Sequence, residues 1–203
     1  MSHDSSIAPK LEEIKQEIDQ ALPNASQEAK DTLLGGVEAQ LRSGQVEPGT
    51  TSAGRVGSRA GKVSELTVIA PLKPGGADRL RSLFKLMNGY FGAADRVGTV
   101  HDMRFVFLPG DEQMLFATAF DGDWDSYIDD FATQIPVEMD LLFSEVEGWP
   151  GIHDPSVKDF IVEYQHTAEG WYVASPDLTV ADTRRAQKKA EIVDELLDKV
   201  GSL

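Results

Sequence analysis

The chain contains no cysteine among its 203 residues. Disulfides, thiolate metal sites and cysteine nucleophiles are therefore excluded, and any catalysis must use other groups. The sequence also lacks an apolar run of about 18 residues, the length that suits a membrane span, and its start lacks the basic and apolar regions of a secretory signal. These absences predict a cytoplasmic protein without a membrane partner.

Positive charge is scarce as well. Lys and Arg number 19 against 34 Asp and Glu, which gives a net charge of −15. A chain this acidic repels a nucleic-acid backbone and an anionic membrane surface. We therefore expect no nucleic-acid partner. A saline habitat and simple solubility are both compatible with the same acidity.

Several catalytic motifs are missing from the sequence. The chain has no G-x-S-x-G elbow, no phosphate-binding loop, no H-E-x-x-H and no G-x-G-x-x-G. The sequence therefore gives no support for a serine hydrolase with a nucleophile elbow, an NTPase, a zinc protease or a dinucleotide-binding enzyme.

The chain begins with the pattern of a helical arm. Two apolar stripes recur at helical spacing, with Leu11, Ile14, Ile18 and Leu22 in the first and Leu33, Leu34, Val37 and Leu41 in the second. Neither stripe can form a core alone, so we expect the arm, residues 1–43, to dock on the main domain, on another subunit or on a separate partner. Residues 44–62 are rich in glycine and lack periodicity, which predicts a flexible linker.

Residues 63–203 are predicted to form one α+β domain. The expected strands are residues 64–72, 103–108, 114–120 and 170–174, and the expected helices are residues 77–87, 123–135, 136–146, 154–166 and 179 to the end. This order is the split βαβ arrangement of the ferredoxin-like fold, with a four-stranded antiparallel sheet and helices on one face. Apolar residues on both strand faces, such as Phe105 and Val106, predict that a second copy covers the open face as in a dimeric α/β barrel.

Four segments of the domain carry a family resemblance. VHDMRFVFL, FDGDWDSYIDDF, EGWPG and SPDLTV resemble segments of a broad group of mostly uncharacterised bacterial proteins. The resemblance covers about residues 63–197 and implies a ferredoxin-like, dimeric α/β-barrel domain, but no settled reaction.

The chain resembles, more distantly, the dimeric α/β-barrel superfamily of dye-decolorising peroxidases, chlorite dismutases and small haem-degrading oxygenases. The peroxidases' G-x-x-D-G motif is matched in part, because Asp121 and Gly122 are present while Thr118 stands where the motif has glycine. This resemblance implies Asp121 as a distal acid and Arg104 as a distal cation. Those peroxidases carry two ferredoxin-like repeats, whereas this chain has one, so the resemblance assigns no proximal haem ligand.

His101, Arg104 and Asp121 are the candidate catalytic residues. A neutral imidazole at His101 can bind haem iron or act as an acid or base, and Asp121 can accept a proton. Arg104 lies in an apolar strand, so its guanidinium must reach water, a carboxylate or an anionic ligand such as peroxide. The structural alternatives are a hydrogen bond of His101 at a sheet edge, an ion pair of Arg104 with Asp121 or Asp123, and helix capping by these two aspartates.

The aromatic residues Trp124, Tyr127 and Trp171 are candidates to line a pocket for a planar ligand, although their spacing equally suits a core. His153 and His166 are the candidate cofactor ligands. The acidic cluster between residues 121 and 130 lacks the twelve-residue loop of an EF-hand and suits helix capping, so we expect no metal site.

Three functions fit these patterns. The first is a homodimer that binds a small hydrophobic, haem-like ligand and acts as a peroxidase- or oxygenase-like oxidoreductase. The second is a non-catalytic interaction protein whose barrel assembles subunits and whose arm recruits a partner. The third is a cyclase or monooxygenase that needs no cofactor. The first is the leading hypothesis, which rests largely on analogy of fold, and the other two are its alternatives.

Overall fold

The structure is a computed structural model that describes residues 7–43, 50–87 and 91–201. The chain divides between residues 49 and 50 into two compact units. The first is a helical arm, and the second is an α+β domain.

The arm consists of α1 (Ile7–Ala21) and α2 (Gln27–Ser43), which pack against each other. Ser26 begins α2 as an N-cap, with its Oγ accepting a hydrogen bond from the Ala29 N–H at 3.2 Å. In the described part of the arm, Ile18 is the one fully buried apolar side chain. The helical arm predicted from the sequence is thus present, but by itself it buries too little apolar surface to form a core.

One antiparallel sheet forms the frame of the α+β domain. Its strands are β1 (Thr51–Ser52), β2 (Ser58–Ala60), β3 (Val63–Pro71), β4 (Val100–Phe107) and β5 (Gln113–Asp121), in the order β1-β2-β3-β5-β4. The turn between β4 and β5 contains Pro109 and Gly110, as expected for a hairpin. Because β5 lies between β3 and β4 and is antiparallel to both, β3 and β4 run parallel to each other.

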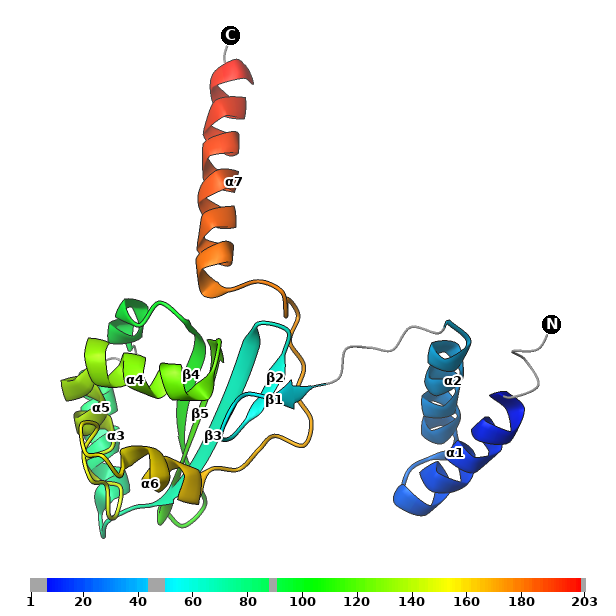
Figure 1. The fold of residues 1–203 in the computed structure, drawn as a ribbon, viewed down its shortest axis with the longest axis horizontal. Helices are drawn as coiled ribbons and strands as arrows, with labels where there is room; N and C mark the ends of the chain where they lie inside the picture. The colour runs from blue at the N-terminus through cyan, green and yellow to red at the C-terminus, as the bar shows by residue number, and fades with distance from the viewer. Residues whose placement is uncertain (1–6, 44–49, 88–90, 202–203) are drawn as a thin grey trace. The chain divides into compact units, whose positions relative to one another are not determined.

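Four helices cover one face of this sheet, as Figure 1 shows: α3 (Gly76–Leu86), α4 (Trp124–Gln134), α5 (Pro136–Leu142) and α6 (Val157–Tyr164). A short 3-10 helix, η2 (Gly92–Arg96), precedes β4. Alternate residues of β4 and β5, such as Phe105 and Phe116, point into a core that includes Phe143 from the segment after α5. The domain is therefore α+β, as the sequence predicted.

The glycine-rich segment before β3 differs from its prediction as a flexible linker. Residues 44–49 of that segment lie outside the described residues, but β1 and β2 form within residues 51–60 and extend the sheet. Gly57, between these strands, has a φ of +82°, and a Cβ there would lie 2.1 Å from the carbonyl oxygen of Glu65. Only glycine allows this close backbone approach, so Gly57 indicates a tight turn between β1 and β2 and not a flexible linker.

The strand predicted at residues 170–174 is absent, because this described segment of the domain has no regular structure. The edge of β3 where it was expected is occupied by β2 and by an isolated antiparallel bridge between Val68 and Gln165. The backbone N–H of His166 also donates to the carbonyl of Thr67 at 2.8 Å. Residues 170–174 thus have no free strand to pair with there, and Tyr172 is exposed.

The last helix, α7 (Val180–Gly201), contrasts with the others. Its first residue is buried, but every residue from Thr183 to Val200 is exposed. In Figure 1 no other described element of the domain lies beside α7 over these turns. The helix expected from residue 179 onward is therefore present, and no described element of the domain covers its apolar side.

Candidate functional site

His101 and Asp121 form the polar centre of the domain. The pairing of β4 with β5 shifts register between Val100 and Asp102, so His101 sits at a β-bulge. Its Nε2 lies 2.7 Å from Oδ1 of Asp121, the last residue of β5. The side chains are mostly enclosed, with 25% of His101 and 11% of Asp121 exposed. The sequence named both residues, and the structure brings them together.

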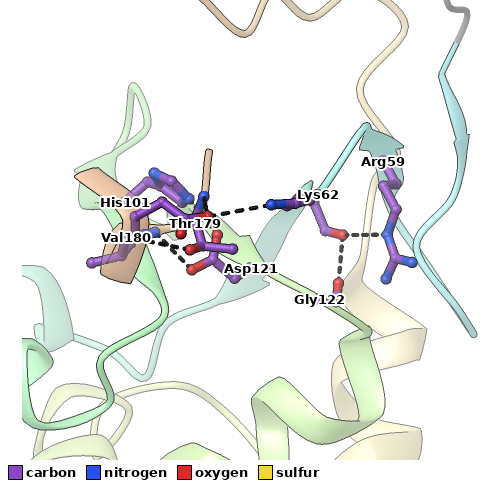
Figure 2. Close-up of polar contacts among 9 residues, drawn as sticks. Arg59, Lys62, His101, Asp121, Gly122, Thr179 and Val180 are labelled. Carbon is purple, nitrogen blue, oxygen red and sulfur yellow. Dashed lines mark hydrogen bonds and ion pairs between the residues drawn. The ribbon is translucent and has the colours of Figure 1, made fainter. Parts of the chain in front are cut away.

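Asp121 also holds the start of α7. Its Oδ2 accepts a hydrogen bond from the backbone N–H of Val180 at 2.9 Å, and Figure 2 shows the three residues meeting at one point. A carboxylate here satisfies an amide that the helix leaves unpaired and opposes the positive end of the helix dipole. The site therefore joins three elements, β4, β5 and α7.

A second carboxylate caps the same helix. Asp182 and Thr179 form a reciprocal pair, in which each backbone N–H donates to the side chain of the other, at 3.0 and 3.2 Å. Lys62 Nζ lies 3.3 Å from Asp182 Oδ2. The hydrogen bonds from Thr179 and the Lys62 ammonium lower the pKa of Asp182 to about 2. Thr179 and Asp182 thus form a capping box at the start of α7.

A hollow of about 290 Å³ borders His101. The other residues that line it are Asp95, Val100, Val180, Thr183, Arg184 and Gln187. Arg184 pairs with Asp95 at 2.8 Å, so the wall carries charges of both signs. This volume is at the lower limit of cavities that hold drug-sized ligands, about 300 Å³. The hollow therefore has room for a small molecule beside the imidazole.

Arg104 does not join this centre. Its guanidinium pairs with Asp102 on the same strand, and 60% of its side chain is exposed. It lies opposite Ala117 of β5, on the sheet face that α3 to α6 do not cover. Arg104 thus pairs with Asp102, and not with Asp121 or Asp123 as considered from the sequence, because Asp121 bonds to His101 and Asp123 pairs with Arg59.

The aromatic candidates fall into two groups. Trp124 and Tyr127 are fully buried in the core, where Tyr127 stacks on Phe120 with ring centroids 3.8 Å apart. The Tyr127 hydroxyl lies 2.6 Å from Thr118 Oγ1, and burial raises the pKa of Tyr127. Trp171 is half-buried in the irregular segment that follows α6. These positions suit packing better than a shared ligand pocket.

The two histidines named as cofactor ligands are also apart from the centre. His153 is exposed in a turn before α6, and His166 is exposed just after α6. Neither residue lines the hollow beside His101. Another hollow, of about 670 Å³, lies between the start of α3 and the β4–β5 turn and contains no residue that the sequence named as a site.

Sequence reasoning missed one buried carboxylate, Glu65 of β3. Its Oε1 accepts hydrogen bonds from the backbone N–H groups of Ser58 at 3.0 Å and Ala168 at 3.2 Å. Glu65 thereby ties β2 and the segment after α6 to β3. A charged residue in the middle of a predicted strand, directly before the apolar Leu66, was the feature of the sequence that could have indicated it.

Within residues 7–43, 50–87 and 91–201, no group of three or more His, Asp or Glu side chains is arranged to hold a metal ion. Among the same described residues, no helix has both the length and the apolar character needed to cross a membrane.

Compared with protein-family models, with curated proteins and with solved structures, the chain matches none. The family resemblance stated from the sequence segments therefore stays a prediction, and function must be argued from the residues themselves.

Proposed function

We propose that this chain is a non-catalytic assembly protein, in which the α+β domain associates with further copies and presents amphipathic helices to protein partners. The observation that carries the proposal is α7. Five large apolar side chains of this helix, Ile192, Val193, Leu196, Leu197 and Val200, are between 53% and 62% exposed. A contiguous exposed apolar surface of this kind is typical of a protein interaction site.

The arm supports the same proposal. Leu22 and Leu33 are exposed, while most other apolar residues of α1 and α2 are only half-buried. A helical hairpin of this size is marginal without a further surface to pack on. Each of the two compact units thus has helices with apolar side chains that no described element of the same unit covers.

The sheet face away from the helices carries a third such surface near β4. Val106 is exposed, and Ile69 and Leu115 beside it are half-buried. We propose that the domain is ferredoxin-like, with the split β3-α3-β4-β5 unit retained and the fourth strand reduced to the Gln165 bridge. A second copy on this face would make a dimeric α/β barrel. We also propose that the protein is cytoplasmic, as inferred from the sequence.

Sedimentation equilibrium of the full chain tests the assembly function. We expect a mass of at least twice the 22.2 kDa of one chain at micromolar concentration, falling toward one chain on dilution. A mass of one chain across the whole concentration range would refute the proposal.

A second function is favoured by one specific observation, the His101–Asp121 pair beside a hollow. A carboxylate that fixes an imidazole is the arrangement of a general acid or base, and a small ligand in the hollow would contact it. Under this second function, the ligand would be the haem-like molecule suggested by the sequence, and the chemistry would be oxidative.

Titration with haemin tests that second function. A Soret shift that His101→Ala abolishes, and that His3→Ala leaves unchanged, would support haem binding at this centre. An unchanged spectrum would remove haem as a ligand and leave only small polar molecules for the hollow.

A further inference from the structure

The exposed side of α7 has a regular seam. Ala190, Val193, Leu197 and Val200 follow one another at alternating spacings of three and four residues, and Ala186 continues the pattern toward the start of the helix. This is the seven-residue repeat by which two helices interlock along their length. Leu196 widens the apolar face on one side of the seam.

Charge differs between the two flanks of this seam. Lys189 and Arg185 lie on the flank that Leu196 widens, whereas Asp194, Asp198 and Glu191 lie on the opposite flank. From Arg185 onward, beyond the Arg184–Asp95 contact, one flank of α7 is therefore basic and the other acidic.

This asymmetry selects the partner and its direction. When two identical helices pair in parallel about a two-fold axis, the basic flank of each faces the acidic flank of the other. In an antiparallel pair, like flanks meet, and Asp194 would approach acidic residues of its partner. Complementary charge thus favours a second α7 running in the same direction.

The attachment of α7 to the domain fits this arrangement. Its first turn is held by Asp121 and by the Thr179–Asp182 pair, and Arg184 bonds to Asp95 of η2. The seam begins beyond these contacts and is exposed throughout. Two domains at the same end of a parallel pair would leave both helix starts attached as they are here.

We propose that α7 pairs with α7 of a second copy as a parallel, in-register coiled coil, with Lys189 of each helix facing Asp194 of the other. The proposal rests on the assembly function proposed above and names the surface that carries it. In the seven-residue repeat, Lys189 and Asp194 occupy the two flanking positions that form ion pairs across a parallel dimer.

Disulfide trapping tests direction and register, and the absence of native cysteine makes it clean. We expect Ala190→Cys and Leu197→Cys each to cross-link to the same position of another copy under mild oxidation. The matched control, Glu195→Cys, lies on the side of α7 away from the seam and should stay unlinked.

A different pattern would overturn the proposal. Cross-linking in a mixture of Ala190→Cys and Val200→Cys chains, with little in either variant alone, would show an antiparallel pair. No cross-link in a full chain that still sediments as an oligomer would place the interface elsewhere, so that the assembly function stands and this inference fails. A monomeric wild-type chain would refute both.

Charge exchange tests the Lys189–Asp194 pairing. We expect Lys189→Glu and Asp194→Lys each to raise the dissociation constant of the oligomer roughly tenfold, because attraction becomes repulsion at two symmetric sites. The double variant should recover most of the wild-type affinity, while the control Glu195→Lys should change it by less than about threefold. A double variant as weak as the sum of the single variants would contradict the pairing.

Discussion

Helices α4 and α7 are both amphipathic, yet only one of them is covered. The apolar side of α4 is buried, with Trp124, Tyr127, Ile128 and Phe131 packed in the core. The apolar side of α7 is exposed from its second turn onward. The difference lies in the partner surface, because β5 presents Phe116 and Phe120 to the helix layer that includes α4, while nothing in the described domain is presented to α7. An apolar stripe stabilises the fold only where the same domain offers a surface to cover it.

The largest change in the free energy of unfolding is expected for a substitution in the core, on the covered side of α4. Phe131→Ala should lower the free energy of unfolding by about 3–5 kcal/mol, because it leaves a cavity among closely packed aromatic residues. Leu197→Ala in α7, measured at a concentration where the chain is monomeric, should change it by less than about 0.5 kcal/mol. Urea unfolding of both variants provides the test, and comparable losses would contradict the contrast between the helices.

A smaller but substantial loss is expected at Glu65. Glu65→Ala removes the acceptor for the N–H groups of Ser58 and Ala168, and a buried donor left without a partner costs about 1–3 kcal/mol. Glu65→Gln, which keeps an acceptor oxygen, should cost less. Urea unfolding again measures both, and equal effects of Ala and Gln would show that the hydrogen bonds are not the cause.

The anchor of α7 should respond more locally. Asp121→Ala removes the acceptor for Val180 and the partner of His101, with an expected loss of about 1–2 kcal/mol at the helix start. Hydrogen exchange of the amides around residues 180–184 should accelerate, while that of β3 and β5 changes little. Unchanged exchange at the helix start would show that Asp121 does not hold α7.

The smallest effect is a pH dependence at the cap. The pKa of Asp182 is lowered from its ordinary value of 3.8 to about 2, so the charged carboxylate stabilises the folded state above pH 3.8. This contribution should be lost as the pH falls through 2. Hydrogen exchange around residue 180, followed between pH 4 and pH 2, should show this loss of stability in the wild-type chain. Asp182→Asn should remove the pH-dependent part, and an identical pH profile in the variant would contradict the assignment.

The sequence predicted the core elements well, because β3, the β4–β5 hairpin and α4 each combine a strong period with turn residues such as Pro109 and Gly122. It failed where pairing depends on residues distant in the chain. The apolar segment at residues 170–174 has strand composition, but the edge of β3 is taken by β2 and Gln165. Glycines at residues 54 and 57 suggested freedom, whereas their positive φ angles form the turn between β1 and β2.

The candidate site was predictable only in part. The residue types at His101 and Asp121 suggested a centre, and the bulge in β4 that lets them meet has no clear signature in the sequence. The spacing of Arg104 gave no indication that Asp102 would take its guanidinium. Val180 takes part through its backbone N–H, which donates to Asp121, and such a contact cannot be predicted from the type of side chain.

Sedimentation of the wild-type chain beside Leu197→Glu, at the same concentrations, tests the central claim that the uncovered side of α7 is where copies of this chain meet. A charge in the seam should raise the dissociation constant of the oligomer, and so lower its mass at a given concentration, without altering the unfolding transition of the α+β domain. An oligomer of unchanged mass in Leu197→Glu would contradict it.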